Sequence, residues 1–177
     1  ESAHYIKGMH NLMGSQFNLG NYQKLNATLK DFEKFCNSKI VLQNHNNLIQ
    51  CFIYHTISQL NKHFLTGNFS DGLLLVEGIE EKLKEYEIYL DRHRILVIYY
   101  KIASMYFGTG NYETAIDYLN KIINWKVDLR NDLQCYARLL HLIAHYELGN
   151  YQLLEYLAKS VYRFMAKMQN LSVVEEE

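Results

Sequence analysis

The sequence contains no proline in 177 residues, although average usage near 5% would give about nine. Proline breaks helix interiors, so its absence favours long helices joined by short turns. Cysteine is scarce as well. The three copies, Cys36, Cys51 and Cys135, are odd in number and scattered, so they form neither a disulfide framework nor a zinc motif. We expect them to be buried free thiols, which suits a reducing cytoplasm.

Surplus charge and long apolar runs are also missing. The formal net charge is −1, whereas nucleic-acid binders usually carry a basic surplus or stripe. The longest apolar runs, such as residues 73–76, fall far short of the roughly 20 residues that a membrane helix needs. The first residues lack a signal-peptide pattern, and a chain that begins with Glu1 is consistent with a fragment of a longer protein. We expect a cytoplasmic protein that binds no nucleic acid and does not insert into a membrane.

One short phrase, glycine–asparagine–aromatic, occurs four times in this chain. Its copies begin at Gly20, Gly67, Gly110 and Gly149, at offsets of 47, 43 and 39 residues. Glycine tolerates the left-handed conformation that ends a helix, and asparagine is among the best N-caps for the next one. The aromatic enters the second helix and can pack back on the first. The phrase therefore predicts a helix end followed directly by a helix start.

Apolar residues on both sides of each phrase recur with helical i, i+3, i+4, i+7 spacing. Ile95, Ile98 and Ile102 precede the third turn, for example, and Ala115 and Leu119 follow it. The predicted helices span residues 3–18, 22–37, 44–65, 69–89, 92–108, 112–125, 131–148 and 151–170. No linker divides the chain, so we expect one all-α domain over residues 1–177, in which helix pairs stack into a solenoid. The predicted units are 3–37, 44–89, 92–125 and 131–170.

The third unit resembles a tetratricopeptide repeat. Its matching residues are Ile102, Ala103, Tyr106, Gly110, Tyr112 and Ala115. In such repeats, small and aromatic residues of the first helix lock against an alanine of the second. The other units keep the turn but have Leu25, Gly72 and Leu154 in place of that alanine, and the offsets exceed the usual length of about 34 residues. The chain is thus similar to a divergent tetratricopeptide-repeat array, which implies a right-handed α-α superhelix of about four antiparallel helix pairs.

The resemblance implies that a protein or peptide binds along a concave groove lined by the first helix of each pair. The groove positions of the family fall on a largely aromatic, nearly uncharged set: Tyr54, Asn61, Phe64, Tyr100, Ser104, Phe107, Tyr136 and Tyr146. Further groove positions of the family fall on Ile57 in the second unit, Val97 in the third, Leu139 and Ile143 in the fourth, and His10 and Phe17 in the first. Ordinary packing between helices is the alternative interpretation of these aromatics. His10 and Gly14 replace the lysine and asparagine with which some members hold a C-terminal carboxylate, so we do not expect a chaperone-tail binder.

Few residue patterns point to chemistry. His141 and His145 are four residues apart and share a helix face, a spacing that can ligate a metal. No third ligand is evident, and His145 falls where the family packs an aromatic, so we expect packing. The sequence has no phosphate-loop or dinucleotide-binding motif, and the glutamates between Glu77 and Glu87 mix with lysines as on a solvated helix face. We expect no enzymatic activity, no metal and no cofactor.

The last predicted helix carries Glu155, Lys159, Arg163 and Lys167 at four-residue steps. This stripe suits the polar outer face of a solenoid's capping helix, or alternatively a basic docking patch. The function that we expect is a non-enzymatic scaffold for binding a protein or peptide. The alternative, which relatives with longer repeats suggest, is a ligand- or peptide-responsive sensor domain within a larger bacterial signalling or transcription-regulatory protein.

Overall fold

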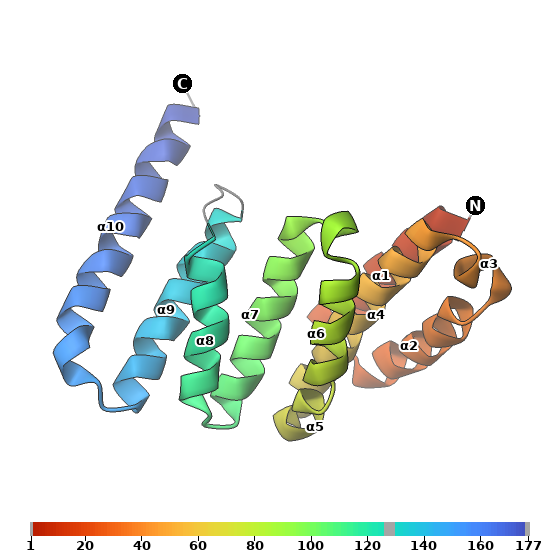
Figure 1. Ribbon diagram of the computed structural model, residues 1–177, viewed down its shortest axis with the longest axis horizontal. Helices are drawn as coiled ribbons and strands as arrows, with labels where there is room; N and C mark the ends of the chain where they lie inside the picture. The colour runs from red at the N-terminus through yellow and green to blue at the C-terminus, as the bar shows by residue number, and fades with distance from the viewer. Residues whose placement is uncertain (1, 126–129, 176–177) are drawn as a thin grey trace. The chain divides into compact units, whose positions relative to one another are not determined.

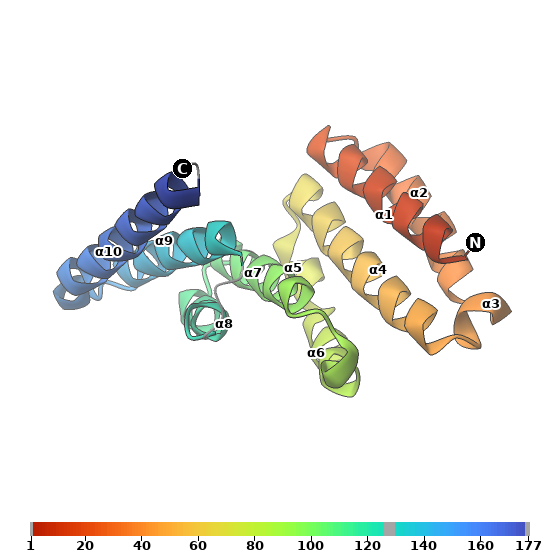
Figure 2. The same cartoon turned by 90° about the horizontal axis from the view of Figure 1, so that it is seen from above.

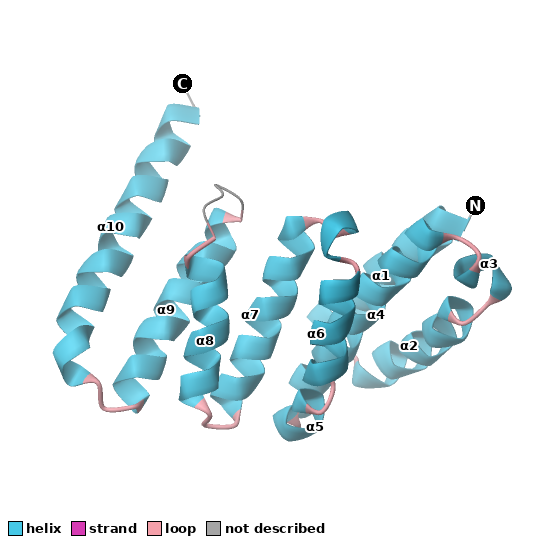
Figure 3. Ribbon diagram, in the orientation of Figure 1, coloured by secondary structure: helices cyan, strands magenta, loops and turns pink. Residues whose placement is uncertain are grey.

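A computed structural model describes residues 2–125 and 130–175. Over these residues the chain is α-helical and has no strand (Figure 3). Its contacts define two compact units, Glu1–Ile98 and Tyr99–Glu177. The boundary between them falls inside one helix, so each unit is described by itself below.

In both units, short connections join each helix to the next along the chain (Figure 1). The first unit contains α1 (Ser2–Asn18), α2 (Tyr22–Cys36), α3 (Lys39–Leu42), α4 (His45–Thr66), α5 (Phe69–Leu73), α6 (Val76–Glu85), a 3-10 turn (Glu87–Tyr89) and the start of α7 (Arg92–Gly108). The second unit contains the rest of α7, then α8 (Tyr112–Ile123), α9 (Asn131–Glu147) and α10 (Tyr151–Glu175). Most of these bounds lie within two residues of the predicted helices. The last helix extends further, to residue 175 instead of 170.

The prediction of one continuous helix over residues 69–89 is wrong. The structure has α5 and α6 there, separated at Leu74 and Leu75. The amide of Leu74 donates to the Asp71 carbonyl at 3.3 Å, and that of Leu75 to the Gly72 carbonyl at 3.2 Å. Both bonds span three residues, the tighter 3-10 spacing. Gly72 lowers the helix propensity of this stretch, which helps to explain why the regular α pattern gives way.

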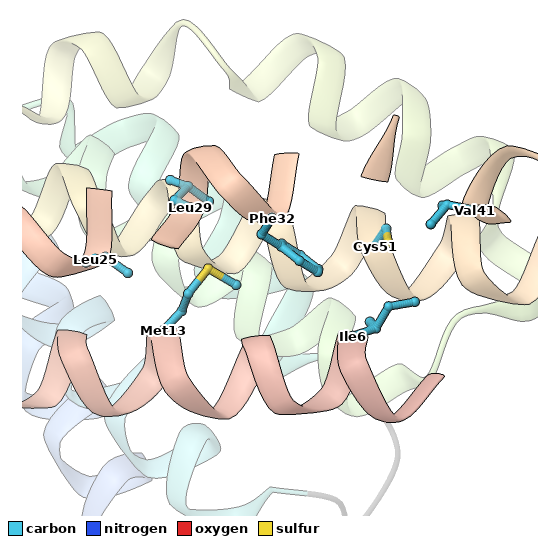
Figure 4. Packing of buried hydrophobic residues seen from close by; sticks show 7 residues of the cluster. All are labelled: Ile6, Met13, Leu25, Leu29, Phe32, Val41 and Cys51. Carbon is cyan, nitrogen blue, oxygen red and sulfur yellow. The ribbon is translucent and has the colours of Figure 1, made fainter. Parts of the chain in front are cut away.

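The core of the first unit lies between α1, α2 and α4, which run side by side (Figure 2). Its buried members, all drawn in Figure 4, are Ile6, Met13, Leu25, Leu29, Phe32, Val41 and Cys51. Val41 belongs to α3, a short helix between α2 and α4 that the sequence analysis did not predict. Because Val41 is fully buried, α3 closes the end of this core instead of lying free in solvent.

All four repeated turns have the predicted left-handed glycine. The φ angles are 65° at Gly20, 66° at Gly67, 79° at Gly110 and 74° at Gly149. At the third turn the Gly110 amide donates to the Phe107 carbonyl, and the Asn111 amide to the Tyr106 carbonyl, each at 3.0 Å. This pair of bonds is the Schellman arrangement that ends a helix.

The asparagine of the turn then begins the next helix. The side-chain oxygens of Asn21, Asn68 and Asn111 accept backbone N–H bonds three residues on, at 3.1, 3.4 and 3.2 Å. The side-chain amide of Asn68 also donates to the Asp71 carboxylate at 2.6 Å, one helical turn further on. In the fourth turn, by contrast, the side-chain amide nitrogen of Asn150 lies 3.1 Å from Nδ1 of His145.

In three of these turns two aromatic rings contact each other across the turn, an arrangement that we call a turn clasp. In each, the aromatic after the asparagine meets an aromatic three residues before the glycine, edge to face. The ring centroids are 5.5 Å apart for Phe64–Phe69, 5.1 Å for Phe107–Tyr112 and 5.7 Å for Tyr146–Tyr151. The clasp ties the end of one helix to the start of the next.

In the second unit, α7 and α8 pack through small and aromatic residues. Ala103 of α7 and Ala115 of α8 are both fully buried, and the rings of Tyr106 and Tyr118 stack with centroids 5.7 Å apart. Small side chains let the two helix backbones approach, and the stacked rings fill the remaining space.

Two polar side chains of α9 fix it between its neighbours. Gln134, which is buried, donates to the Ile122 carbonyl at the end of α8 at 2.7 Å. Its side-chain oxygen accepts from Arg138, also at 2.7 Å. The guanidinium of Arg138 in turn lies 4.0 Å from the centre of the Phe164 ring on α10, a cation–π contact. One connected set of contacts therefore links α8, α9 and α10.

Candidate functional site

The candidate site is an exposed apolar stripe on α9, defined by Tyr136, Ile143 and Tyr146. Their exposed fractions are 57%, 45% and 56%. The spacings of seven and three residues place all three on one helix face, and Leu139, partly exposed, falls on the same face. The other sides of α9 bury Leu133, Ala137 and Ala144. The helix is thus apolar on this partly exposed face as well as on the side that packs.

Tyr136 is the most available member of the stripe. Within the described part of the chain its ring makes no aromatic contact, whereas Tyr146 belongs to a turn clasp. Tyr100 on α7 is close enough that Tyr136 helps to raise the Tyr100 pKa, although burial of the Tyr100 ring is the larger cause. Tyr100, which is half-buried on α7, and Tyr136, which is exposed on α9, therefore lie near each other.

Other predicted groove residues of the second unit have structural partners of their own. The Ser104 hydroxyl donates to the backbone carbonyl of Tyr100, one turn earlier in the same helix, at 2.8 Å. The hydroxyl proton of Ser104 is therefore already used in a hydrogen bond within α7. Phe107 packs on Tyr112 in the third turn. These side chains support the face, while Tyr136 and Tyr146 supply its exposed aromatic surface.

The first unit places its predicted groove residues differently. The Tyr54 ring contacts two side chains. The His10 ring stacks on it with ring centroids 4.0 Å apart, and the Arg94 guanidinium lies 5.2 Å from its centroid. Burial, together with the nearby charge of Arg94, lowers the pKa of His10 to about 4. Asn61 is only 5% exposed, and Phe64 packs on Phe69 in a turn clasp.

His141 and His145 lie close together on α9, with ring centroids 4.6 Å apart. Burial, with a smaller effect from the charges of His145 and Arg138, lowers the pKa of His141 to about 4. Across the described residues, no three His, Cys, Asp or Glu side chains gather as metal ligands would. The histidine pair contributes to packing: Nδ1 of His145 meets the Asn150 amide of the following turn.

Sequence reasoning missed three basic residues with specific positions: Arg94, Arg138 and Lys101. Arg94 and Arg138 lie over aromatic rings, and burial lowers the pKa of Lys101 to about 8. None of them belongs to a motif. Arg138 follows Gln134 by one helical turn, which is the only local signal of the polar pair that they form.

The outer stripe of α10 is polar, as the sequence predicted. Lys159 pairs with Glu155 at 2.5 Å, and Arg163 donates to the Lys159 carbonyl at 3.2 Å. Tyr162 nearby is 75% exposed. Surface ion pairs of this kind contribute little stability, roughly 0–1 kcal/mol, but they keep this face hydrated.

Comparisons with known proteins add no relative. No protein-family model matches the chain, and neither curated proteins nor solved structures give a match. Among the described residues, no helix combines the length and the apolar character that crossing a lipid bilayer demands. The candidate site itself is therefore the basis on which a function can be inferred.

Proposed function

We propose that this chain is a non-enzymatic scaffold that binds an apolar segment of another protein or peptide on the α9 stripe. The observation that carries the proposal is the row of exposed Tyr136, Ile143 and Tyr146 on one face. Tyrosine is enriched at interface hot spots because its ring buries a large area at low entropic cost and its hydroxyl can still hydrogen-bond. Scattered exposed apolar residues need no explanation, but an aligned row of them does.

The chemistry of the stripe indicates the kind of partner. Its members carry no formal charge, so a charged segment would lose hydration on binding without gaining an opposite charge. An uncharged segment with apolar side chains, and backbone groups that can reach the tyrosine hydroxyls, fits it best.

The finer fold is part of the same proposal. We propose that the helix pairs form a superhelix like that of tetratricopeptide repeats. It is supported by the left-handed glycine turns, which occur in both units, and by the buried alanines Ala103 and Ala115 where that family places small residues. In such a fold, α9 is a first helix, and its exposed face belongs to the concave side.

Peptide selection on the intact chain tests the function. A random peptide library is selected on the immobilised protein, and the strongest binder is synthesised and titrated by fluorescence anisotropy. We expect an apolar peptide of low charge whose Kd weakens at least tenfold, a loss of about 1.4 kcal/mol or more, when Tyr136 is changed to alanine.

Tyr162→Ala is the matched control, since it removes the same side chain from an exposed position on α10. Its Kd should equal that of the wild type, and both variants should keep the wild-type Tm because neither ring is buried. If the two variants bind alike, or if selection gives no peptide that binds, the assignment of the α9 stripe is wrong.

A further inference from the structure

Two of the three cysteines meet in the core of the first unit. Cys51 lies in the second turn of α4, is only 3% exposed and belongs to the buried cluster (Figure 4). Cys36 is the last residue of α2, is half-buried and packs against the same cluster. A hydrogen bond joins the two side chains. Helices α2 and α4 thus hold the two thiols in contact although 15 positions separate them in the sequence.

We propose that Cys36 and Cys51 form a reversible disulfide that links α2 to α4 when the protein meets a small disulfide oxidant such as oxidised glutathione. Both partners sit on helices that pack together. The third cysteine, Cys135 on α9, lies in the other unit and is a natural internal control.

The hydrogen bond also distinguishes the two thiols. It raises the pKa of Cys36, with burial adding to the rise, and it lowers the pKa of Cys51. Cys36 is the more accessible sulfur, and Cys51 is the one held closer to the thiolate form that attacks disulfides.

The exchange proceeds in two balanced steps. Cys36, once deprotonated, attacks one sulfur of the oxidant, forms a mixed disulfide and releases one small thiolate, which takes up a proton. Cys51 then loses its proton, attacks the Cys36 sulfur and expels the second small thiolate, which takes up a proton. The two protein thiols lose two electrons and two protons in total, and the oxidant is reduced to two thiols.

The test titrates the full chain with oxidised glutathione and maps peptides without reduction. We expect a peptide pair joined through Cys36 and Cys51, and a rise in Tm of about 10 °C, since the link closes a loop of about 15 residues. Cys135→Ser should react in the same way. Cys51→Ala, which keeps a small apolar side chain in the core, should instead accumulate glutathione on Cys36.

Three outcomes would overturn the proposal. In one, the wild type retains glutathione on Cys36 and forms no internal link. In another, the oxidised product is a dimer joined between chains. In the third, neither thiol reacts while the protein remains folded. Circular dichroism should show that the helices of Cys51→Ala persist, so that glutathione retained on Cys36 in this variant reports the missing second thiol and not misfolding.

Discussion

Replacing Gly20 by alanine isolates the energetic cost of the left-handed turn. Gly20 has a φ of 65°, and its amide donates to the Phe17 carbonyl at 2.9 Å. A Cβ added there would meet no atom within 4 Å. The change therefore introduces no steric clash with the rest of the protein, and the only penalty is the local conflict between a Cβ and left-handed backbone. We expect a loss of about 1–2 kcal/mol in the free energy of unfolding.

Gly8→Ala is the matched control within α1. An added Cβ there also meets nothing within 4 Å, but Gly8 lies inside a helix and has no positive φ. Alanine costs less backbone entropy than glycine in a helix, so this variant should gain about 0.5–1 kcal/mol. The same methyl group, added 12 positions apart in the sequence, should change stability in opposite directions.

Urea titration followed by far-UV circular dichroism measures both variants, and hydrogen exchange of α1 and α2 amides localises the effect. With an unchanged slope m, the midpoint should fall for Gly20→Ala and rise for Gly8→Ala. If Gly20→Ala is as stable as the wild type, or gains as much as Gly8→Ala, the turn does not need a left-handed residue, and the account of the repeated phrase fails.

Three further predictions concern the packed interior. The pKa of His141 is about 4 in the folded protein, whereas the unfolded chain binds a proton near pH 6.5. The stability that the neutral ring contributes is therefore full above pH 6.5 and falls as the pH drops toward 4. Tm measured across this window should decline less steeply for His141→Gln than for the wild type. Gln134→Ala removes the donor to the Ile122 carbonyl and should cost about 1–3 kcal/mol in urea titrations, while Gln152→Ala at an exposed site changes little. Phe32→Ala, which empties a fully buried site, should cost about 3–5 kcal/mol by the same measurement.

The parts of the fold that the sequence predicted are those that local interactions decide. A left-handed glycine followed by an asparagine cap needs only a few neighbouring residues, so all four turns were predictable. The break at Leu74 was not, because it depends on a balance between 3-10 and α bonding that apolar periodicity does not report. The burial of Val41 in α3 likewise depends on its contacts with distant helices.

The features of the candidate site also differ in whether local sequence could predict them. The family resemblance implied equivalent groove positions for Tyr136 and Asn61, yet one is 57% exposed and the other 5%, because exposure depends on which helices cover each face. The clasp partners could have been found from the sequence, since each stands three residues before a turn glycine. The contact between Cys36 and Cys51 could not, because no pattern links a position at the end of one helix to a position inside the next long one.

The rigidity of α9 explains why its exposed face suits binding. Gln134 holds one side of the helix to α8, and Arg138 holds another to α10. The backbone beneath Tyr136 and Tyr146 is therefore fixed before any partner arrives, and a partner would have to order little more than the exposed rings themselves. Ordering side chains costs about 0.5–1.5 kcal/mol each on binding, so an anchored helix loses less free energy than a loose one bearing the same residues. Helix α10 also exposes tyrosines, among them Tyr156 and Tyr162, but they share its surface with the Glu155–Lys159 ion pair, whose hydration a partner would have to displace. An apolar partner should accordingly prefer α9 over the more exposed terminal helix.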